Sequence, residues 1–297
     1  MALPVALPPW HLVVQAVISG LLIGCVYALI ALGLALIWGV MEVVNFAHGE
    51  FLMIAGYLAC FLFALYGIDP ILSAFLGFIV AGLIGLAVQK GVVERVLGSP
   101  PIVTILVTFS VLLIMRYGAL AALGPEVTTT HPWYGVKSIH LGPIAIPLVG
   151  LICAGASLAA TGMLYVFLTR TYTGIALRAT AQNRMAAQLQ GIDIKKMYTL
   201  AFVIGTALTG FAGGLLASFF YIYPEVGARF CALSFVIVVL GGFGSLPGAF
   251  VGGLIIGVAG EVAAVFIPPV MKDVVAFIIF ILVLLFKPTG LFGGRAS

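Results

Sequence analysis

Long, uninterrupted apolar runs are the feature that most constrains how this chain can fold. Hydrophobic residues make up 63% of the sequence and charged residues only 7%, a balance that water-soluble domains of this length do not show. Because the runs are continuous rather than alternating, they indicate membrane-spanning helices and not barrel strands. We therefore expect an all-α, polytopic membrane protein with a single transmembrane domain over residues 1–297.

About eight spans, within a range of about seven to nine, are expected when apolar runs of about 20 residues are counted against a hydrocarbon core of ~30 Å. The runs are Leu12–Trp38, Phe51–Tyr66, Ile71–Gln89, Ile102–Leu123, Ile144–Leu168, Tyr198–Tyr221, one within Ala232–Phe266, and Val274–Phe286. The four cysteines lie in or beside these runs at no metal-ligand spacing. They are interpreted as small packing residues, and no metal site is predicted.

The longest polar segment, Arg170–Lys196, carries five of the thirteen positive charges of the chain. Apolar runs flank it, and its positive excess places the loop 169–197 on the cytoplasmic side. Its composition favours a helix over Gly174–Gln190. Gly191 is expected to end that helix, and Asp193 to cap the helix that follows.

One face of that expected helix is made mostly of small side chains at the 3.6-residue period. Its residues are Ile175, Ala179, Gln182, Ala186 and Leu189. A short helix with a shallow face beneath a membrane domain is typical of a docking surface for a soluble partner. The alternative is a solvated connector between two spans.

Basic loops set the orientation of the spans. Those near position 90 and at the C-terminal end should also be cytoplasmic, which places Gly124–Pro143 outside. Alternation then requires Ala232–Phe266 to begin and end outside, so it must be re-entrant or cross twice as short, broken segments. Its break, Leu240–Gly253, contains six glycines and a proline, which cannot form a regular helix. A close-packed seam of small residues is the compatible alternative.

A second interruption, Glu42–Glu50 with the sequence EVVNFAHGE, breaks the apolar stretch in the first half of the chain. A charge at the bilayer centre costs about 2.5 to 3.5 kcal/mol on insertion scales, so acids there would be expensive without a function. Paired interruptions of this kind indicate a transport site. His48 is equally consistent with a structural histidine that bonds a neighbouring carbonyl. Glu50 is equally consistent with a partner of a basic residue at the cytoplasmic edge.

Three motifs stand out from the apolar background. They are R-A-x-A-Q-N at Arg178–Asn183, followed by Gly191-Ile192-Asp193; N-F-A-H-G-E at Asn45–Glu50; and L-G-G-F-G-S-x-P-G-A at Leu240–Ala249. In combination they resemble the branched-chain amino acid permease family of ABC importers, and the resemblance covers nearly the whole chain. The broader importer pattern E-A-A-x3-G is matched only in part, because Met185 stands where its glutamate would be.

The resemblance implies that the cytoplasmic loop couples to an ATPase and that the two interruptions form a translocation pathway or gate. The implied coupling residues are Arg178, Ala179, Gln182, Asn183, Ala186, Ala187, Gly191 and Asp193. The implied pathway residues are Asn45, Phe46, His48, Glu50, Gly241, Gly242, Phe243, Gly244 and Ser245. Asn45 and the N–H groups near Gly242 and Gly244 are expected to face a substrate carboxylate, since helix ends bind anions. His48 or Glu50 is expected to hold the closed gate or to meet the ammonium group of the substrate.

The resemblance also implies partners. A second, LivM-like permease subunit, two ATPase subunits and a periplasmic substrate-binding protein would complete an importer for branched-chain or related small amino acids. The chain would then be a multi-pass protein of the bacterial inner membrane bilayer, with no nucleic acid partner. It would need no cofactor, because ATP binds the partner ATPase subunits. Similar permeases serve urea, short amides and aromatic acids, so these substrates stay open.

No catalytic motif indicates an enzyme. The P-loop pattern G-x-x-x-x-G-K-[ST] is absent, so the chain cannot cradle ATP by itself. Neither H-E-x-x-H nor G-x-S-x-G occurs in a supporting context. A protein of a different class, an ion-coupled secondary transporter, would need acids at mid-span, for which only Glu42, Glu50 and Glu261 are candidates.

Overall fold

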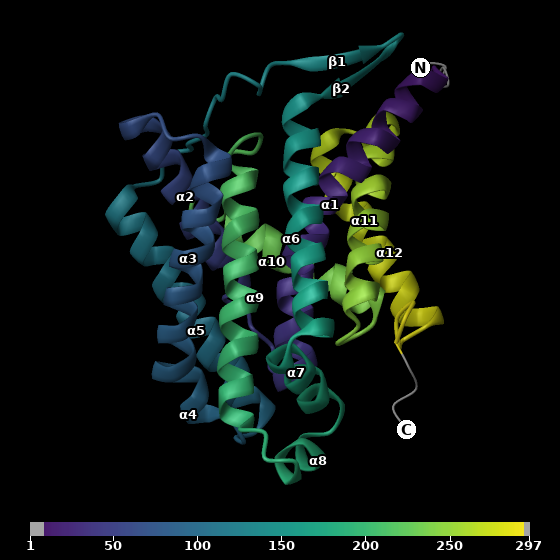
Figure 1. Cartoon of the computed structure of the whole chain (residues 1–297). Helices are drawn as coiled ribbons and strands as arrows, with labels where there is room; N and C mark the ends of the chain where they lie inside the picture. The colour runs from purple at the N-terminus through teal and green to yellow at the C-terminus, as the bar shows by residue number, and fades with distance from the viewer. Residues whose placement is uncertain (1–8, 294–297) are drawn as a thin grey trace.

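In the computed structural model, which describes residues 9–293, helices run up and down in a bundle (Figure 1). The first half contains α1 (Trp10–Met41), α2 (His48–Tyr66), α3 (Pro70–Val88), a π-helical turn (Gln89–Val93), α4 (Glu94–Val96) and α5 (Pro101–Leu123). A hairpin of β1 (Ser138–Leu141) and β2 (Ile144–Pro147) follows. The second half contains α6 (Leu148–Arg170), α7 (Tyr172–Gln182), α8 (Arg184–Leu189), α9 (Ile194–Leu216), α10 (Val226–Gly241), α11 (Leu246–Phe266), a 3-10 turn (Pro269–Met271) and α12 (Lys272–Phe286).

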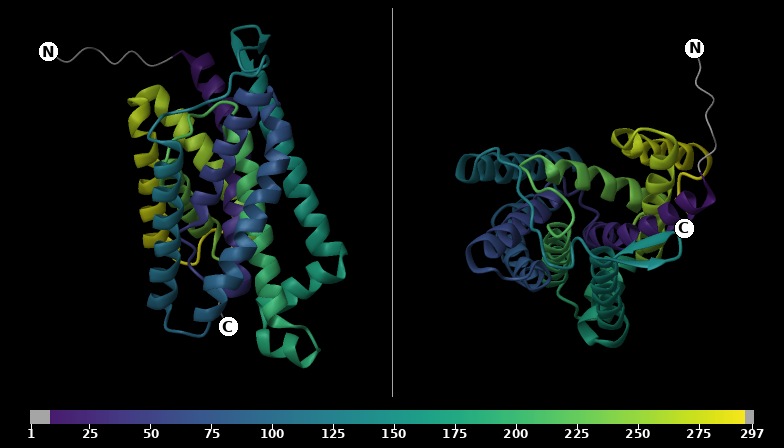
Figure 2. Two further views of the ribbon diagram at one scale, coloured as in Figure 1. Left: turned by 90° about the vertical axis from the view of Figure 1, so that its left-hand side faces the viewer. Right: turned by 90° about the horizontal axis from the view of Figure 1, so that it is seen from above.

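Seven helices of the described residues are long and apolar enough to cross a membrane, which confirms the predicted all-α, polytopic fold. α10 is apolar but shorter, with 16 residues. It meets α11 at the turn 242–245, so the stretch 232–266 consists of the end of a shorter helix followed by one helix long enough to span a membrane. Seen from above, α10 lies strongly tilted across the bundle (Figure 2).

The β-hairpin is a correction to the predicted spans. The sequence predicts a span from Ile144, but the first residues of that run pair with β1, from Ser138 opposite Pro147 to Leu141 opposite Ile144. Gly142 in the connecting turn has a φ of 62°, a left-handed conformation that glycine adopts without steric penalty. The helix of this span, α6, therefore begins only at Leu148.

Helices α1 and α9 form the centre of the bundle. In their most apolar stretches 83% and 78% of the residues are buried, against 22% for α5. Glycines let the backbones approach closely: a Cβ on Gly33 of α1 would lie 2.4 Å from the carbonyl oxygen of Gly205 in α9. Gly253 of α11 packs in the same way against Ala28, which confirms the seam of small residues expected there.

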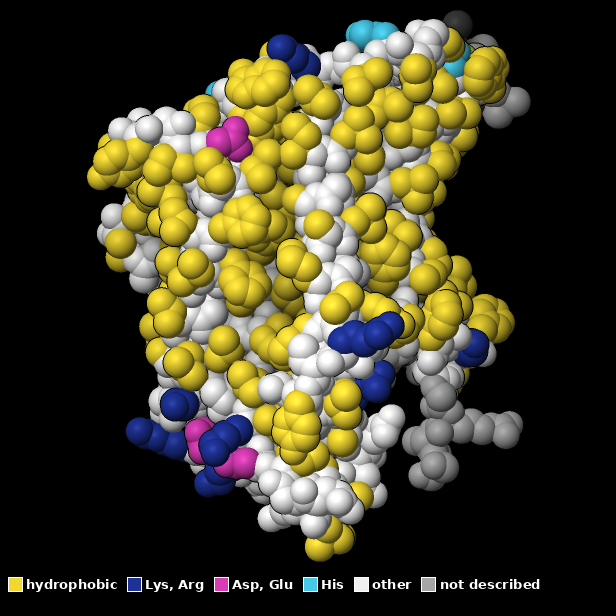
Figure 3. All heavy atoms as spheres, viewed as in Figure 1, with side chains coloured by type: hydrophobic (Ala, Val, Ile, Leu, Met, Phe, Trp, Pro, Cys, Tyr) yellow, Lys and Arg dark blue, Asp and Glu magenta, His cyan; other side chains and the backbone are white. Residues whose placement is uncertain are grey.

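Basic side chains gather at one end of the bundle, which we call the basic end (Figure 3). They come from the segment around α4, from α6 to α8 and from the start of α9. These residues are Lys90, Arg95, Arg170, Arg178, Arg184, Lys195 and Lys196. The opposite end carries β1 and β2 and is called the hairpin end (Figure 1).

Substitution of Gly33 by alanine should lower the melting temperature of the protein in detergent, because the added methyl group meets the backbone of α9. Overpacking of this kind costs about 1–3 kcal/mol. The matched control is Gly155→Ala in α6, where no atom lies within 4 Å of the added Cβ. Its melting temperature should stay the same or rise, so equal melting of the two variants would contradict the close α1–α9 contact.

Candidate coupling surface and translocation pathway

The loop 169–197 holds two short helices instead of the single helix Gly174–Gln190 that the sequence predicts. α7 and α8 meet at Asn183, whose φ of −155° and ψ of 106° are extended. The Asn183 side-chain oxygen accepts a hydrogen bond of 2.9 Å from the Ala186 amide. An asparagine side chain caps a new helix better than it continues an existing one, and the break therefore falls here.

Both predicted end signals of this loop are confirmed. Gly191 follows α8 with a φ of 81°. Asp193 caps α9, and its carboxylate accepts a hydrogen bond of 3.2 Å from the Lys196 amide. That backbone hydrogen bond and the Lys196 ammonium group hold the pKa of Asp193 below its usual value. α9 therefore begins at a defined residue, Ile194.

Apolar side chains of α7 and α8 are exposed at the basic end. The exposed fractions are 83% for Tyr172, 48% for Ile175, 75% for Met185 and 81% for Leu189. We call these four residues the docking patch, because apolar side chains gathered in a polar loop mark a surface that a partner covers. Ile175 and Leu189 belong to the face expected from the sequence, whereas Ala187, an expected coupling residue, is buried.

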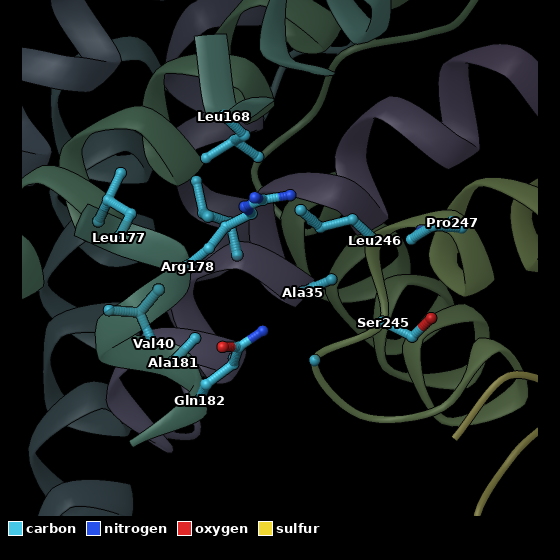
Figure 4. A pocket seen from close by; sticks show the side chains of 13 residues that line it. Ala35, Val40, Leu168, Leu177, Arg178, Ala181, Gln182, Ser245, Leu246 and Pro247 are labelled. Carbon is cyan, nitrogen blue, oxygen red and sulfur yellow. The ribbon is translucent and has the colours of Figure 1, made fainter. Parts of the chain in front are cut away.

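Arg178 and Gln182 instead line a cavity of about 260 Å³ between α7, α1 and the turn 242–245 (Figure 4). Gly244 and Ser245, two residues expected in the pathway, line the other side of this cavity. Ala35 of α1 lies between the two sides. The fold thus brings together residues expected in coupling and residues expected in the pathway, which lie far apart in the sequence.

The glycine-rich turn is closed by hydrogen bonds. Gly242 and Gly244 have φ values of 101° and 75°, which favour glycine. The Leu291 amide donates a hydrogen bond of 2.8 Å to the Leu240 carbonyl. The Gly242 amide donates at 2.9 Å to the Val238 carbonyl, so it ends α10 and is not free to face a substrate carboxylate, contrary to the expectation.

The other expected pathway residues of this turn make packing and capping contacts. Gly241 lies so close to Gly248 that a Cβ on it would meet the Gly248 backbone at 2.2 Å. The ring of Phe243 packs on Trp38 of α1, with ring centroids 4.7 Å apart. Ser245 caps α11, since its hydroxyl accepts a hydrogen bond of 3.1 Å from the Gly248 amide.

The interruption between α1 and α2 is exposed at Glu42 and is largely covered by protein after it. Asn45 has no exposed surface, and its side-chain oxygen accepts a hydrogen bond of 3.1 Å from a backbone amide two residues on. The Val44 carbonyl accepts a hydrogen bond of 3.0 Å from the Thr108 hydroxyl of α5. The Phe46 carbonyl accepts one of 3.2 Å from the Cys231 thiol of α10. Non-helical backbone at membrane depth needs such cover.

His48 is fully buried at the start of α2. Its Nε2 lies 3.0 Å from the carbonyl oxygen of Ile30 in α1 and 2.9 Å from the hydroxyl of Thr209 in α9. These contacts join three helices, which is the arrangement expected of a structural histidine. A role for His48 in the pathway stays a prediction.

Glu50 forms an ion pair with Arg116 of α5, with 2.5 Å between Oε1 and Nη2. The side chain of Glu50 has no exposed surface, and that of Arg116 is 18% exposed. The alternative expected partner was a basic residue at the cytoplasmic edge, but Arg116 lies within a spanning helix. Sequence reasoning missed Arg116, although a lone charge inside an apolar run is itself a signal.

The end of α1 is tied to α8 by an ion pair between Glu42 and Arg184. Glu42 has a φ of 55°, an uncommon left-handed conformation for a residue other than glycine. The Arg184 guanidinium also lies over the Tyr198 ring, 6.0 Å from its centroid. A contact of this kind links the loop that carries the docking patch directly to the first residue of the interruption.

The pairing of Arg229 with Asp273 was not predicted from the sequence either. The Arg229 guanidinium of α10 donates two hydrogen bonds, of 2.7 and 3.0 Å, to the Asp273 carboxylate of α12. Next to them, Lys272 bonds Glu261 of α11 at 2.9 Å. These pairs hold the last helix of the described chain against α10 and α11.

Substitution of His48 by alanine should lower the melting temperature markedly. The change empties a buried site and removes a contact between three helices, so we expect a loss of about 2–4 kcal/mol. Thr209→Val is the control, because it removes one hydroxyl at nearly constant volume and should cost only about 1 kcal/mol. A melting temperature for His48→Ala equal to that of the wild type would rule out the structural role.

Comparison with known proteins identifies the family. A family model described as the permease component of branched-chain amino acid transport systems matches residues 16–284. The chain is 32% identical to the high-affinity branched-chain amino acid transport system permease protein LivH of Salmonella typhimurium, over 94% of this chain and 95% of that protein. It is 33% identical to the corresponding permease protein BraD of Pseudomonas aeruginosa, over 97% and 98% of the two chains.

Among solved structures, PsaBC from Streptococcus pneumoniae in complex with Fab is similar, with a TM-score of 0.50 over 94% of this chain and 92% of that chain. At 14% sequence identity this likeness concerns the fold alone. The family match and the curated relatives both cover nearly the whole chain, including both interruptions and the loop with the docking patch. The chain belongs to the family of permease components of branched-chain amino acid transport systems.

Proposed function

We propose that this protein is a membrane-spanning permease subunit of an ABC importer that moves branched-chain or related small amino acids across the bacterial inner membrane. The docking patch is the observation that carries the proposal, because its exposed apolar side chains lie at a polar end of a transport permease. The chain has no nucleotide-binding motif of its own. An ATPase subunit that covers the patch supplies the energy.

The basic end faces the cytoplasm in this proposal. Positively charged loops remain on the cytoplasmic side during insertion, and this end holds most of the Lys and Arg residues. Two ATPase subunits then reach the docking patch from inside the cell. They bind the ATP, so this chain needs no cofactor and is not itself an enzyme.

The hairpin end faces the periplasm and receives a substrate-binding protein. Trp133 and Val136 beside the hairpin are 67% and 92% exposed, and aromatic side chains are common anchors at protein interfaces. A second, LivM-like permease subunit completes the pathway. The relatives are named as permease proteins of high-affinity transport systems, which supports a set of separate components.

Movement of α7 and α8 reaches the pathway by two routes. α7 shares the cavity lined by Arg178 and Ser245 with the glycine-rich turn. α8 is tied to the end of α1 by the ion pair of Arg184 with Glu42. When the ATPase subunits close, they shift both short helices, and the two interrupted segments alternate between outward and inward access.

Two alternatives differ in substrate or energy source. Urea, short amides and aromatic acids are alternative substrates within the family. An ion-coupled secondary transporter is the alternative of a different class, and it would need a free acid at mid-span. Glu42, Glu50 and Glu261 are all engaged in ion pairs, which favours the ATP-driven function.

The double variant Met185→Glu, Leu189→Glu should lose both co-purification of the ATPase subunits and ATP-dependent amino acid uptake, because two charges would enter an apolar interface. The loss of affinity should be at least about a hundredfold, since interface anchors carry about 2 kcal/mol or more each. Uptake into membrane vesicles and co-purification in mild detergent are the measurements.

The control is Val136→Glu, which places one such charge on an exposed apolar residue at the hairpin end. It should retain the ATPase subunits. If the double variant keeps its ATPase partner and its uptake, the docking patch is not the coupling surface. If the wild type yields no ATPase and takes up substrate on an ion gradient alone, the secondary transporter becomes the better description.

Charge reversal at Arg184 should uncouple transport without unfolding the protein. An exposed ion pair contributes only about 0.2–1 kcal/mol to stability, so melting should barely change. The ratio of amino acid uptake to ATP hydrolysis in proteoliposomes should fall several-fold in Arg184→Glu and recover in Glu42→Arg, Arg184→Glu. Lys195→Glu, which breaks a longer pair with Glu94 in the same region, is the control. Full coupling in Arg184→Glu would exclude this route.

A further inference from the structure

Glu50 and Arg116 form an ion pair inside the spanning part of the bundle. The carboxylate comes from the first turn of α2 and the guanidinium from α5. Burying two opposite charges is at best near neutral for stability when compared with apolar residues of the same volume. Charged groups in spanning helices are rare and mark functional positions. Packing alone therefore does not account for this ion pair.

The pair is incompletely bonded. Oε2 of Glu50 and Nε of Arg116 are both buried and have no hydrogen-bond partner among the described residues. A carboxylate accepts several hydrogen bonds and a guanidinium donates several. Each charged group therefore keeps one hydrogen-bonding atom without a partner. In a low-dielectric environment such an unsatisfied polar atom is costly in free energy. A ligand with both a charged donor and a charged acceptor can satisfy both groups.

The exposed part of the pair belongs to Arg116 of α5. Helices α2 and α10 enclose the carboxylate, since a Cβ on Gly227 would lie 2.8 Å from the carboxyl carbon of Glu50. Gly49 and Gly227 bring the two helices into backbone contact at this point. Arg116, in contrast, retains 18% of its surface. A ligand that reaches Glu50 must therefore pass or displace Arg116.

Helix α5 is the least embedded of the seven spanning helices, with 22% of its most apolar stretch buried. Arg116 bonds it to Glu50, and Thr108 bonds it to the Val44 carbonyl. Few contacts thus hold α5, and it can move without disturbing the packed centre of α1 and α9.

We propose that the Glu50–Arg116 pair is a latch between α2 and α5 that a zwitterionic amino acid opens by exchange. This inference rests on the proposed function and narrows it. The substrate ammonium group replaces Arg116 at Glu50, and the substrate carboxylate replaces Glu50 at Arg116. No charge is left unpaired in the exchange.

The exchange discriminates between the substrate classes that the family leaves open. Urea and short amides carry no charge, so they replace neither partner of the pair. An aromatic acid without an amino group replaces only Glu50 at Arg116 and leaves the Glu50 carboxylate unpaired. Only a zwitterion compensates both, and the latch therefore selects amino acids.

The test uses the assembled importer with its binding protein in proteoliposomes and L-leucine as the probe. The variant is Glu50→Gln, Arg116→Met, which removes both charges at similar volume, so no unpaired charge stays buried. Co-purification of the ATPase subunits checks that it assembles. A merely structural pair predicts leucine uptake close to wild type, whereas the latch predicts a fall of at least about tenfold, since charged hydrogen bonds to the substrate are lost.

A second measurement follows the latch itself by the distance between nitroxide labels on Tyr66 and Leu123, exposed residues near the hairpin-end termini of α2 and α5. The four native cysteines are buried. In wild type the distance should increase with L-leucine and stay unchanged with 4-methylpentanamide, its uncharged analogue. In the double variant the distance should be insensitive to both.

The outcomes separate the latch from the proposed function. Wild-type leucine uptake together with normal uptake by the double variant overturns the latch and leaves the importer function standing. A label distance in wild type that ignores leucine, or that responds equally to the amide, also overturns the latch. Absence of ATP-driven leucine uptake by the wild type overturns the proposed function and the latch with it.

Discussion

Lipid cannot form hydrogen bonds with a free peptide group, and this constraint governs the whole bundle. An unsatisfied backbone group in hydrocarbon is costly, so a chain whose helices are interrupted at membrane depth must surround each interruption with protein. The break between α1 and α2 is covered by α5 and α10, which bond its carbonyl groups. The turn between α10 and α11 is covered by the segment after α12, which bonds the carbonyl groups of Leu240 and Gly241. The candidate pathway thus depends on tertiary contacts with other helices.

Glycine supplies the close packing that this cover requires. Gly33 and Gly205 bring α1 and α9 into backbone contact, and Gly49 and Gly227 do the same for α2 and α10. In a bilayer the lipid is as apolar as the helix surfaces, so close van der Waals contact has to stabilise helix association. A buried polar group such as His48 must therefore find its partners on neighbouring helices, which ties the break to the centre of the bundle.

The sequence predicts those features of the fold that local chemistry decides. Apolar length gives the spans, and the end of α8 at Gly191 and the cap at Asp193 follow from backbone freedom and side-chain bonding. The division of the predicted helix into α7 and α8 at Asn183 is harder to predict. Helix propensity and capping compete at this residue, and the surrounding loop decides which of them prevails. The partner of Glu50 lies 66 residues away, and no local signal shows which lone charge comes to face it. Likewise, the resemblance assigns Arg178 to the coupling loop and Ser245 to the pathway. Only the tertiary structure, in which α1 packs between them, shows that both residues line the same cavity.

The two ion pairs at the first interruption differ in solvent exposure, and this difference suits them to two different roles. Glu42 and Arg184 are 70% and 44% exposed, so water screens the pair and α8 can change its position at little cost in stability. Glu50 is fully buried, and Coulomb attraction there is several times stronger than in water because the effective dielectric constant is low. Opening the inner pair without a substrate leaves two charges uncompensated, whereas a zwitterion compensates both. In the proposed importer, the outer pair therefore transmits movement from the partner subunits, while the inner pair holds the pathway closed until a substrate of the right charge is present.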